Sequence, residues 1–164
     1  MFNAQKNTIW LDSDGVMMDF DKHALEIFGM TAERFEYQYG TEEFWNTIRT
    51  RDPEFFLNLD LTPDAMTLYL SVQHLPHAIL TGIPREGVNE NSNQKIESFR
   101  RRFGESLKIY CTQASKKWTY CVPGDILIDD RFRYSKKWEN AGGTFIHHKS
   151  AQESIEKLRE IGVI

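Results

Sequence analysis

Residues 8–21 read Thr8-Ile-Trp-Leu-Asp-Ser-Asp-Gly-Val-Met-Met-Asp-Phe-Asp21, and the rest of the chain is interpreted around this stretch. The apolar run Ile9–Leu11 is typical of a short buried strand. It ends in two carboxylates, Asp12 and Asp14, and Gly15 behind them allows a sharp backbone turn. Since Asp and Gly also favour ordinary turns, the stretch alone fits either a polar turn or a ligand site.

The two carboxylates are expected at the carboxyl end of a strand, where open parallel α/β sheets bind their ligands. At this spacing Asp12 and Asp14 repel each other unless a cation or a shared proton compensates them. Mg²⁺ suits this role, because it takes one or two carboxylates and keeps its other positions for water and substrate phosphate. The stretch therefore predicts a Mg²⁺ site at a sheet edge.

Length and composition restrict the class of protein. The 164 residues are enough for one well-buried core, and a hydrophobic content of 40% is ordinary for a globular protein. A net charge of -4 argues against general nucleic-acid binding. The sequence has neither an apolar signal region nor a run of membrane-spanning length, which predicts a cytoplasmic protein with no membrane partner. The oligomeric state stays open, a homodimer included.

Residues 17–60 differ in composition from the rest of the chain. They are rich in aromatic residues and show helical spacing without strand-like alternation. One helix is expected near 21–29, where Gly29 ends it, and another near 41–50. We interpret 17–60 as a small helical cap inserted after the first strand, while 1–16 and 61–164 form the α/β core domain.

From Leu61 onward, predicted strands and helices alternate. Thr62-Pro63-Asp64 is typical of a capped helix start and leads into a helix over 65–73, while the polar residues 84–93 are expected to form a loop. Alternation of this kind favours a doubly wound parallel sheet. Strands are predicted at 78–80, 107–111, 125–128 and 144–146, and further helices at 94–103, from 115, at 133–141 and at 150–161.

Polar side chains follow the predicted strands at their carboxyl ends. Thr81 follows the second strand, the Lys116/Lys117 pair lies beyond the third, and Asp129 and Asp130 end the fourth. Together with the first carboxylates, these groups would face one crevice. They supply what phosphoryl transfer needs, namely a nucleophile, an acid or base, metal ligands and donors for the phosphate oxygens.

Four motifs resemble those of the haloacid dehalogenase (HAD) superfamily of phosphohydrolases: Asp12–Val16, Leu80–Gly82, Lys117 and Ile128–Arg131. Within that superfamily, the chain is similar to the 5'(3')-deoxyribonucleotidases. Further points of similarity are Phe20, Phe44-Trp45, Phe55-Phe56 and Pro123–Arg131. The resemblance implies a Rossmann-like, HAD-like sheet with a helical cap after the first motif. It also implies Mg²⁺-dependent dephosphorylation of a small phosphate ester, a (deoxy)nucleoside monophosphate.

The resemblance implies a role for each residue of the sheet edge. Asp12 would form an aspartyl-phosphate, and Asp14 would protonate the leaving alcohol and then activate water. Mg²⁺ would sit on the Asp12 carboxylate, the Asp14 carbonyl and one carboxylate of the 129/130 pair, with the other nearby. Thr81 would hydrogen-bond the phosphate, and Lys117 would pair with the phosphate and with Asp12.

The sequence also departs from the family pattern. Gly82 stands where the nucleotidases commonly have Ser, so it offers only a backbone N–H, and Ser115 replaces a frequent basic residue. Both changes leave the reaction class intact but leave the substrate open. Lys117 matches the family spacing to the segment 127–130 better than Lys116, although the sequence does not decide between them.

Three aromatic residues bear on the substrate. Phe20, Phe44 and Trp45 are expected to stack on a nucleotide base, which can contribute about 1 to 3 kcal/mol. The same rings would also serve as the core of the cap. Alternatives to a nucleotidase are a HAD phosphatase for another small phosphate or a nucleic-acid 3'-phosphate, and a nucleotide-binding protein without turnover. The Asp12/Asp14 pair favours an enzyme, because a binding protein gains nothing from two repelling carboxylates.

Overall fold

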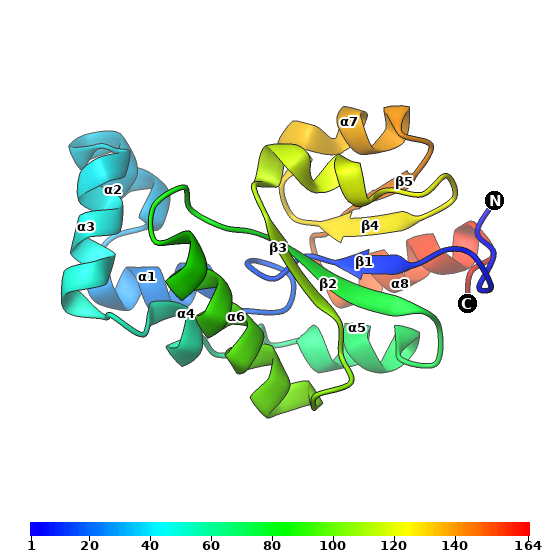
Figure 1. Ribbon diagram of the computed structural model, residues 1–164, viewed down its shortest axis with the longest axis horizontal. Helices are drawn as coiled ribbons and strands as arrows, with labels where there is room; N and C mark the ends of the chain where they lie inside the picture. The colour runs from blue at the N-terminus through cyan, green and yellow to red at the C-terminus, as the bar shows by residue number, and fades with distance from the viewer.

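A five-stranded parallel sheet forms the centre of the computed structural model, which describes residues 1–164 (Figure 1). The strands are β1 (Ile9–Leu11), β2 (His77–Gly82), β3 (Ile109–Thr112), β4 (Ile126–Asp129) and β5 (Thr144–His147). They lie in the order β3-β2-β1-β4-β5, and every neighbouring pair is parallel. Apolar clusters cover both faces of the sheet, so the predicted doubly wound α/β fold is confirmed.

The two faces of the sheet are covered by different elements (Figure 1). Ile9 and Leu11 of β1 point into a cluster of 25 buried residues, whereas Trp10 between them joins a smaller cluster on the other face. The larger cluster lies under α5 (Ala65–Val72), α6 (Val88–Phe103) and α8 (Ala151–Glu160). The smaller cluster lies under the 3-10 segment η1 (Ala114–Tyr120) and α7 (Ser135–Asn140), which follows the 3-10 turn η2 (Phe132–Tyr134).

A helical insert separates β1 from the rest of the sheet in sequence. Its helices are α1 (Phe20–Phe28), α2 (Ala32–Tyr39), α3 (Thr41–Arg51) and α4 (Phe55–Asn58). The insert lies at one end of the molecule, and both chain termini lie at the opposite end (Figure 1). Buried side chains of α1, α3 and α4 belong to the same cluster as the sheet, so the insert continues the core. The boundaries at 16/17 and 60/61 stay a prediction.

Most predicted elements agree with the observed ones within two residues at each end. The predicted helices near 21–29 and 41–50 correspond to α1 and α3, and Gly29 ends α1 in the left-handed conformation with φ 69°. α2 and α4 were not predicted. Both are short, and α2 contains no fully buried residue, so it carries little of the apolar periodicity by which a helix is recognised.

The predicted cap of α5 is wrong. The helix begins at Ala65, after Thr62 and Pro63, and Asp64 makes no capping hydrogen bond to it. The Thr62 hydroxyl donates to the carbonyl of Val16 at 2.8 Å, and the Asp64 carboxylate accepts from the backbone N–H of Ala151 at 2.6 Å. Both side chains serve contacts with distant segments, because tertiary partners compete with the local capping site.

The predicted loop over 84–93 is wrong in its second half, because α6 begins at Val88. The backbone N–H of Asn91 donates to the carbonyl of Gly87 at 2.9 Å, and its side-chain amide donates to the carbonyl of Glu86 at 3.0 Å. These bonds close the first turn of a polar segment whose composition alone is typical of a loop.

The pairing of β1 with β4 sets the floor of the site. The backbone N–H of Asp12 donates to the carbonyl of Ile128 at 2.9 Å, which brings Asp12 beside Asp129 at the carboxyl edge. At the opposite edge, the buried carboxylate of Asp125 accepts from the indole Nε1 of Trp10 at 2.8 Å. The two strands are therefore tied together at both ends.

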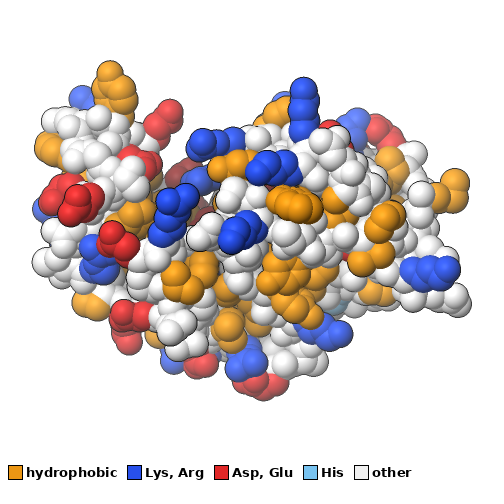
Figure 2. Space-filling model, turned by 45° about the horizontal axis from the view of Figure 1, so that its top comes forward, with side chains coloured by type: hydrophobic (Ala, Val, Ile, Leu, Met, Phe, Trp, Pro, Cys, Tyr) orange, Lys and Arg blue, Asp and Glu red, His pale blue; other side chains and the backbone are white.

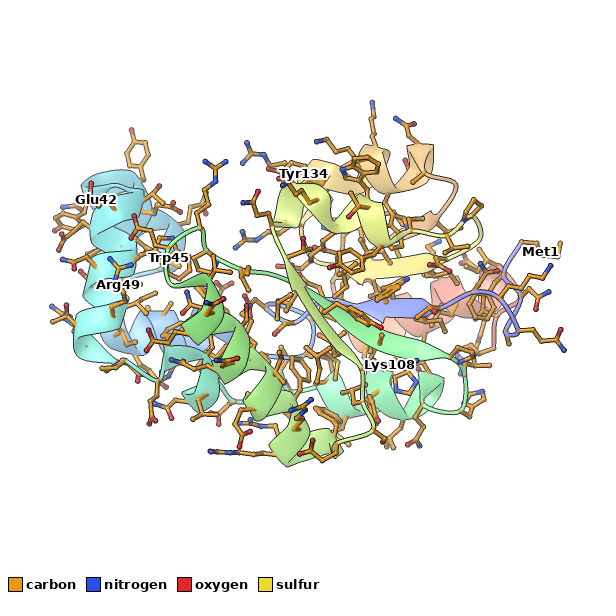
Figure 3. The ribbon with its side chains drawn as sticks, in the orientation of Figure 1. Met1, Glu42, Trp45, Arg49, Lys108 and Tyr134 are labelled. Carbon is orange, nitrogen blue, oxygen red and sulfur yellow. The ribbon has the colours of Figure 1, made fainter.

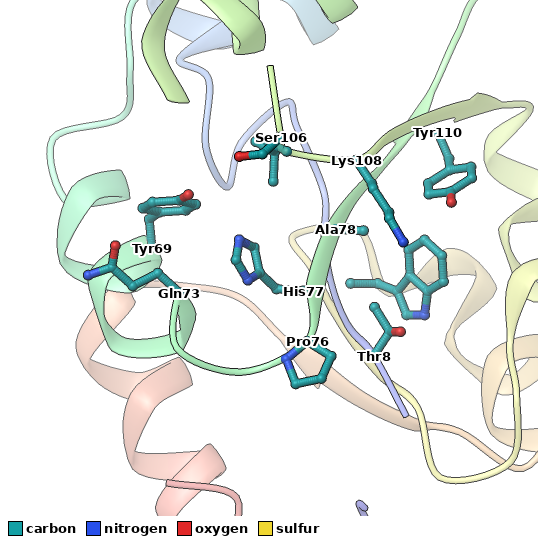
Figure 4. Close-up of a pocket in the computed structure, with 11 residues that line it drawn as sticks. Thr8, Tyr69, Gln73, Pro76, His77, Ala78, Ser106, Lys108 and Tyr110 are labelled. Carbon is teal, nitrogen blue, oxygen red and sulfur yellow. The ribbon is translucent and has the colours of Figure 1, made fainter. Parts of the chain in front are cut away.

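A cavity of about 350 Å³ opens near the amino ends of the strands (Figure 4). The rings of Tyr69 and His77 meet edge to face within it, with centroids 5.3 Å apart. Its lining includes Lys108 but no carboxylate, so the acidic groups of the sheet lie elsewhere. None of the helices is both long enough and apolar enough to cross a membrane.

Candidate active site

A cleft of about 590 Å³ lies between the helical insert and the carboxyl edge of the sheet. Figure 2 shows the hollow between the insert and the larger body of the molecule. Of the seven side chains predicted at this edge, with Lys116 counted, five line the cleft: Asp12, Asp14, Lys117, Asp129 and Asp130. Thr81 is fully buried and does not line the cleft, whereas its neighbour Gly82 does.

Lys117 is the buried cation at the floor of the cleft. Its Nζ lies 2.7 Å from Oδ1 of Asp12 and 2.7 Å from Oδ2 of Asp129, and the residue is 5% exposed. Burial lowers the pKa of Lys117, but the charges of Asp12 and Asp129 outweigh burial and raise the pKa above its usual value. Lys117 therefore stays an ammonium ion that joins the ends of β1 and β4. The adjacent Lys116 is exposed.

Asp12, Asp129 and Asp130 place carboxylate oxygens within 4.8 Å of one another. Burial raises the pKa of Asp12, and the charge of Asp129 raises it further. Both oxygens of Asp129 have partners, since Oδ2 binds Lys117 and Oδ1 accepts from the backbone N–H of Arg131 at 2.8 Å. Burial and the charges of Asp12 and Asp129 raise the pKa of Asp130 to about 7.

The turn after Asp12 brings the backbone close to Asp130. Gly15 has a φ of 78°, and a Cβ at this position would collide with the Asp130 carboxylate. Glycine is therefore required at position 15 both for the backbone conformation and for the close approach. On the other side of the same carboxylate, Oδ1 of Asp130 is buried without a hydrogen-bond partner.

A second buried lysine, which was not predicted, completes the site. Nζ of Lys95 donates to Oδ2 of Asp14 at 2.6 Å, to Oγ1 of Thr81 at 2.9 Å and to the carbonyl of Gly82 at 3.1 Å. These bonds use all three donors of the ammonium group. Nζ also lies 4.4 Å from the ring centroid of Phe56 in the insert. Lys95 therefore links Asp14 to β2 and to the insert.

The sequence carries a weak signal for Lys95. Lys95, Ser98 and Phe99 have the i, i+3, i+4 spacing of one helix face, and all three are buried. A lysine in line with a buried phenylalanine is a candidate for a buried role. The signal is hidden in the sequence, because α6 begins with seven residues in which polar side chains dominate.

The charges on the cleft floor favour a divalent cation. If all groups are ionised, the four carboxylates and the ammonium groups of Lys95 and Lys117 leave a formal charge of -2. The orphaned Oδ1 of Asp130 gives such an ion a free ligand atom. Asp130 belongs with Asp12 and Asp129 to a group of carboxylates whose oxygens lie within 4.8 Å of one another, and Mg²⁺ prefers oxygen ligands. The residues present therefore fit Mg²⁺, which the carboxylates of Asp12 and Asp130 would hold.

The predicted stacking residues differ in accessibility. Phe20, Phe44 and Trp45 all contribute to the cleft lining, but Phe20 is 7% exposed and Phe44 only 3%. Phe20 packs against Phe55 with ring centroids 5.1 Å apart, and Phe44 packs against Phe28 at 4.9 Å. Trp45 is partly buried, so it is the ring of the three with most surface free for a ligand.

No protein-family model matches the sequence, and a search of curated proteins gives no match. Solved structures nevertheless resemble this one. A HAD family hydrolase from Deinococcus radiodurans R1 with bound phosphate and sodium has a TM-score of 0.55 at 14% identity, covering 87% of this chain and 80% of that chain. A hydrolase from Streptococcus pneumoniae TIGR4 has a TM-score of 0.55 at 14% identity, covering 96% and 98%.

An L-2-haloacid dehalogenase from Xanthobacter autotrophicus, with chloropropionic acid covalently bound, has a TM-score of 0.53 at 9% identity, covering 100% of this chain and 85% of that chain. At these identities the likeness defines the fold alone. The chain has the HAD-like fold, with a five-stranded parallel sheet and a helical insert after β1.

The raised pKa of Asp130 predicts that Mg²⁺ stabilises the folded protein more at high pH than at low pH. Between its ordinary pKa and about 7, the folded protein holds this proton more tightly than the unfolded chain. The contribution of Asp130 to stability is therefore lost as pH rises through about 7. Thermal denaturation should show that Mg²⁺ raises the midpoint more at pH 8 than at pH 6, by roughly 3 to 6 °C. Asp130→Asn should remove most of this difference, and equal Mg²⁺ shifts at both pH values would contradict the assignment.

Lys95→Met should weaken the binding of inorganic phosphate in the presence of Mg²⁺ by about tenfold or more, as measured by calorimetry. The variant removes one positive charge from the cleft floor and the hydrogen bond that orients Thr81. Arg102→Met is the matched control, because Arg102 lies two turns further along α6 and binds the carbonyl of Leu59 outside the cleft. An unchanged dissociation constant for Lys95→Met would mean that Lys95 serves the fold alone.

Proposed function

We propose that the protein is a Mg²⁺-dependent phosphomonoesterase that dephosphorylates (deoxy)nucleoside monophosphates through an aspartyl-phosphate on Asp12, as the 5'(3')-deoxyribonucleotidases do. The observation that carries this proposal is the buried Lys117 ammonium between Asp12 and Asp129 at the floor of the cleft. Oδ1 of Asp12 accepts from Lys117 and from the backbone N–H of Ser13 at 2.8 Å, whereas Oδ2 has no hydrogen bond within the protein. A fixed carboxylate with one free oxygen is suited to nucleophilic attack.

The proposed reaction has two steps. Oδ2 of Asp12 attacks phosphorus while the bond from phosphorus to the ester oxygen breaks, and Asp14 gives its proton to the departing alcohol. Water then attacks phosphorus, Asp14 takes a proton from it, and the bond to Asp12 breaks to release phosphate. When bound, Mg²⁺ supplies charge neutralisation for the phosphoryl oxygens. Asp14 is 23% exposed at its side chain and so reaches both the cleft and Lys95.

Within this proposal, Asp130 is the direct metal ligand of the 129/130 pair. Its Oδ1 has no partner, while both oxygens of Asp129 are already bound. Asp129 would then hold Lys117 in place. Thr81 would influence the phosphate indirectly, because its hydroxyl is hydrogen-bonded to Lys95. Gly82 lines the cleft and would contact the phosphate through its backbone.

The comparisons support the proposed chemistry on this fold. The Deinococcus structure holds a phosphate and a sodium ion, so a protein of this fold binds an anion together with a cation. The Xanthobacter dehalogenase holds its ligand covalently, so a protein of this fold forms a covalent adduct. A cleft of about 590 Å³ is also within the usual range for small-molecule sites.

Asp12→Asn tests the covalent step. The change is nearly isosteric and relieves repulsion with Asp129, so the variant should fold while losing at least about a thousandfold in kcat. Phosphate release from a panel of nucleoside monophosphates and sugar phosphates with Mg²⁺ is the measurement. Asp14→Asn should bind phosphate but turn over slowly. If Asp12→Asn keeps more than roughly a few per cent of the wild-type activity, Asp12 is not the nucleophile.

Trp45→Ala tests the nucleotide part of the proposal. It should raise KM for a nucleoside monophosphate by about tenfold, because base stacking is worth roughly 1 to 3 kcal/mol, and it should spare p-nitrophenyl phosphate. Phe20→Ala should show the same selectivity if its small exposed edge contacts the base. The control is Phe55→Leu, which changes the same aromatic cluster at a ring that does not line the cleft. Parallel losses on both substrates would make the aromatic residues structural.

A further inference from the structure

The segment that follows Asp130 is rich in cations and contains no acid as far as Lys137. Arg131, Arg133 and Lys137 are exposed, as is Lys116 on the neighbouring segment η1. We call these four residues the basic rim. None of their side chains forms an ion pair or a hydrogen bond within the protein. Five other exposed cations are paired with acids, namely Lys22, Arg49, Arg100, Arg101 and Lys157, whereas Lys6, Arg34, Arg85, Lys108, Lys136, Lys149 and Arg159 are exposed without an acidic partner.

Aromatic rings alternate with the cations of the basic rim. Trp118 is 44% exposed and Phe132 59% exposed, and Tyr134 is partly buried. Arg133 lies 5.4 Å and Lys137 lies 5.6 Å from the ring centroid of Tyr134. Trp118 and Phe132 therefore expose ring surface beside cations that have no acidic partner.

Two residues of the basic rim, Arg131 and Arg133, line the same cleft as the acidic floor. Arg131, Arg133, Trp118 and Tyr134 line the cleft together with Asp12. Figure 3 places Tyr134 on the sheet side of the cleft and Trp45 on the insert side, and Figure 2 shows Lys and Arg side chains gathered along the sheet side. A ligand held at Asp12 would therefore have the basic rim beside it.

The charges of the two walls select the path of an anionic ligand. The insert contributes three acids to its wall of the cleft, namely Asp21, Glu33 and Glu36. A polyanion is repelled by that wall and attracted by the basic rim. The phosphoryl group itself is already served on the floor by Lys117 and the proposed cation, so the rim offers binding capacity for further phosphates.

We propose that the basic rim binds a single-stranded nucleic acid whose terminal phosphate the active site removes. The proposal rests on the proposed phosphomonoesterase function, with the terminal nucleotide of the strand in the place of the mononucleotide. The phosphodiesters of the preceding nucleotides pair with Arg131, Arg133 and Lys137, and their bases stack on Trp118 and Tyr134. Cations that track a backbone, interleaved with rings that accept any base, are the features that bind single strands.

A single strand fits better than a duplex or a compact polyphosphate. Bases in a duplex are stacked on each other and leave no face for Trp118 or Tyr134. A nucleoside bisphosphate would use the cations but only one ring. The net charge of -4 agrees with a short, local contact to a chain end, because a protein that coats nucleic acid needs a broad basic surface.

The first test compares kcat/KM with Mg²⁺ for a deoxynucleoside monophosphate, a nucleoside 3',5'-bisphosphate, and single-stranded oligodeoxynucleotides of about eight residues. The strand carries its phosphate at the 3' end in one substrate and at the 5' end in another. The kcat/KM for one of the two oligodeoxynucleotides should exceed that for the monophosphate by about tenfold or more at low salt. Salt should remove most of this advantage, because about three phosphate contacts to a single strand lose roughly eighteenfold in affinity between 50 and 200 mM salt.

The second test removes two cations from the basic rim. In Arg133→Gln/Lys137→Gln, the ratio of kcat/KM for the strand to that for p-nitrophenyl phosphate should fall about tenfold. Lys157→Gln/Arg159→Gln is the matched control, since it removes the same charge from α8, which covers the other face of the sheet. That ratio should stay unchanged in the control. Trp118→Ala should lower the ratio at all salt concentrations, because stacking is not screened.

The outcomes separate this proposal from the proposed function. The strand proposal is wrong if kcat/KM for the oligodeoxynucleotide does not exceed that for the monophosphate, or if the bisphosphate gives the same kcat/KM as the oligodeoxynucleotide. In either case the proposed phosphomonoesterase function stands. If no ester releases phosphate, the proposed function is wrong. Fluorescence anisotropy with a labelled oligonucleotide that has no terminal phosphate then decides strand binding. Salt-sensitive binding that Arg133→Gln/Lys137→Gln weakens would support the basic rim, and its absence would overturn it.

Discussion

The contact of the Lys117 ammonium with Asp12 and Asp129 is the constraint on which the rest of the site depends. Parallel pairing of β1 with β4 places two buried carboxylates side by side, and burial alone would favour their neutral forms. A buried ion pair adds little net stability, because desolvation offsets most of the attraction. Its value here is positional, since it keeps an ionised oxygen of Asp12 at a fixed point of the cleft floor.

Lys95 repeats this arrangement one strand away. It joins Asp14, at the turn after β1, to Thr81 and Gly82 at the end of β2. Three neighbouring strand ends are thus joined by two ammonium groups. Four carboxylates still outnumber two cations. Burial and this surplus of negative charge together raise the pKa of Asp130, and one of its oxygens has no partner. This incomplete charge balance favours a divalent cation at the floor.

The local pattern of the sequence was enough to predict the sheet edge. An apolar strand that is followed by Asp12, or by Asp129 and Asp130, shows in its sequence that its carboxyl end is polar. Because the strands are parallel, these polar ends meet at one edge of the sheet. The reach of long side chains across elements could not be predicted in this way. Lys95 lies on a helix 14 residues beyond Thr81, and periodicity gives its face but not its partners. For the same reason the sequence did not separate the buried Phe20 and Phe44 from the more accessible Trp45, or Asp129 from Asp130.

Under the proposed function, the walls of the cleft, rather than its floor, distinguish one phosphate ester from another. Once a divalent cation offsets the formal charge of -2, the floor is close to neutral and attracts any phosphoryl group only at short range. Longer-range attraction within roughly 10 Å then comes from the exposed cations Arg131 and Arg133. The acids of the insert on the opposite wall act against it, so an anionic ligand is drawn along the sheet side of the cleft. Placed in this way on a protein of net charge -4, the cations orient an incoming anion before the floor contacts its phosphate.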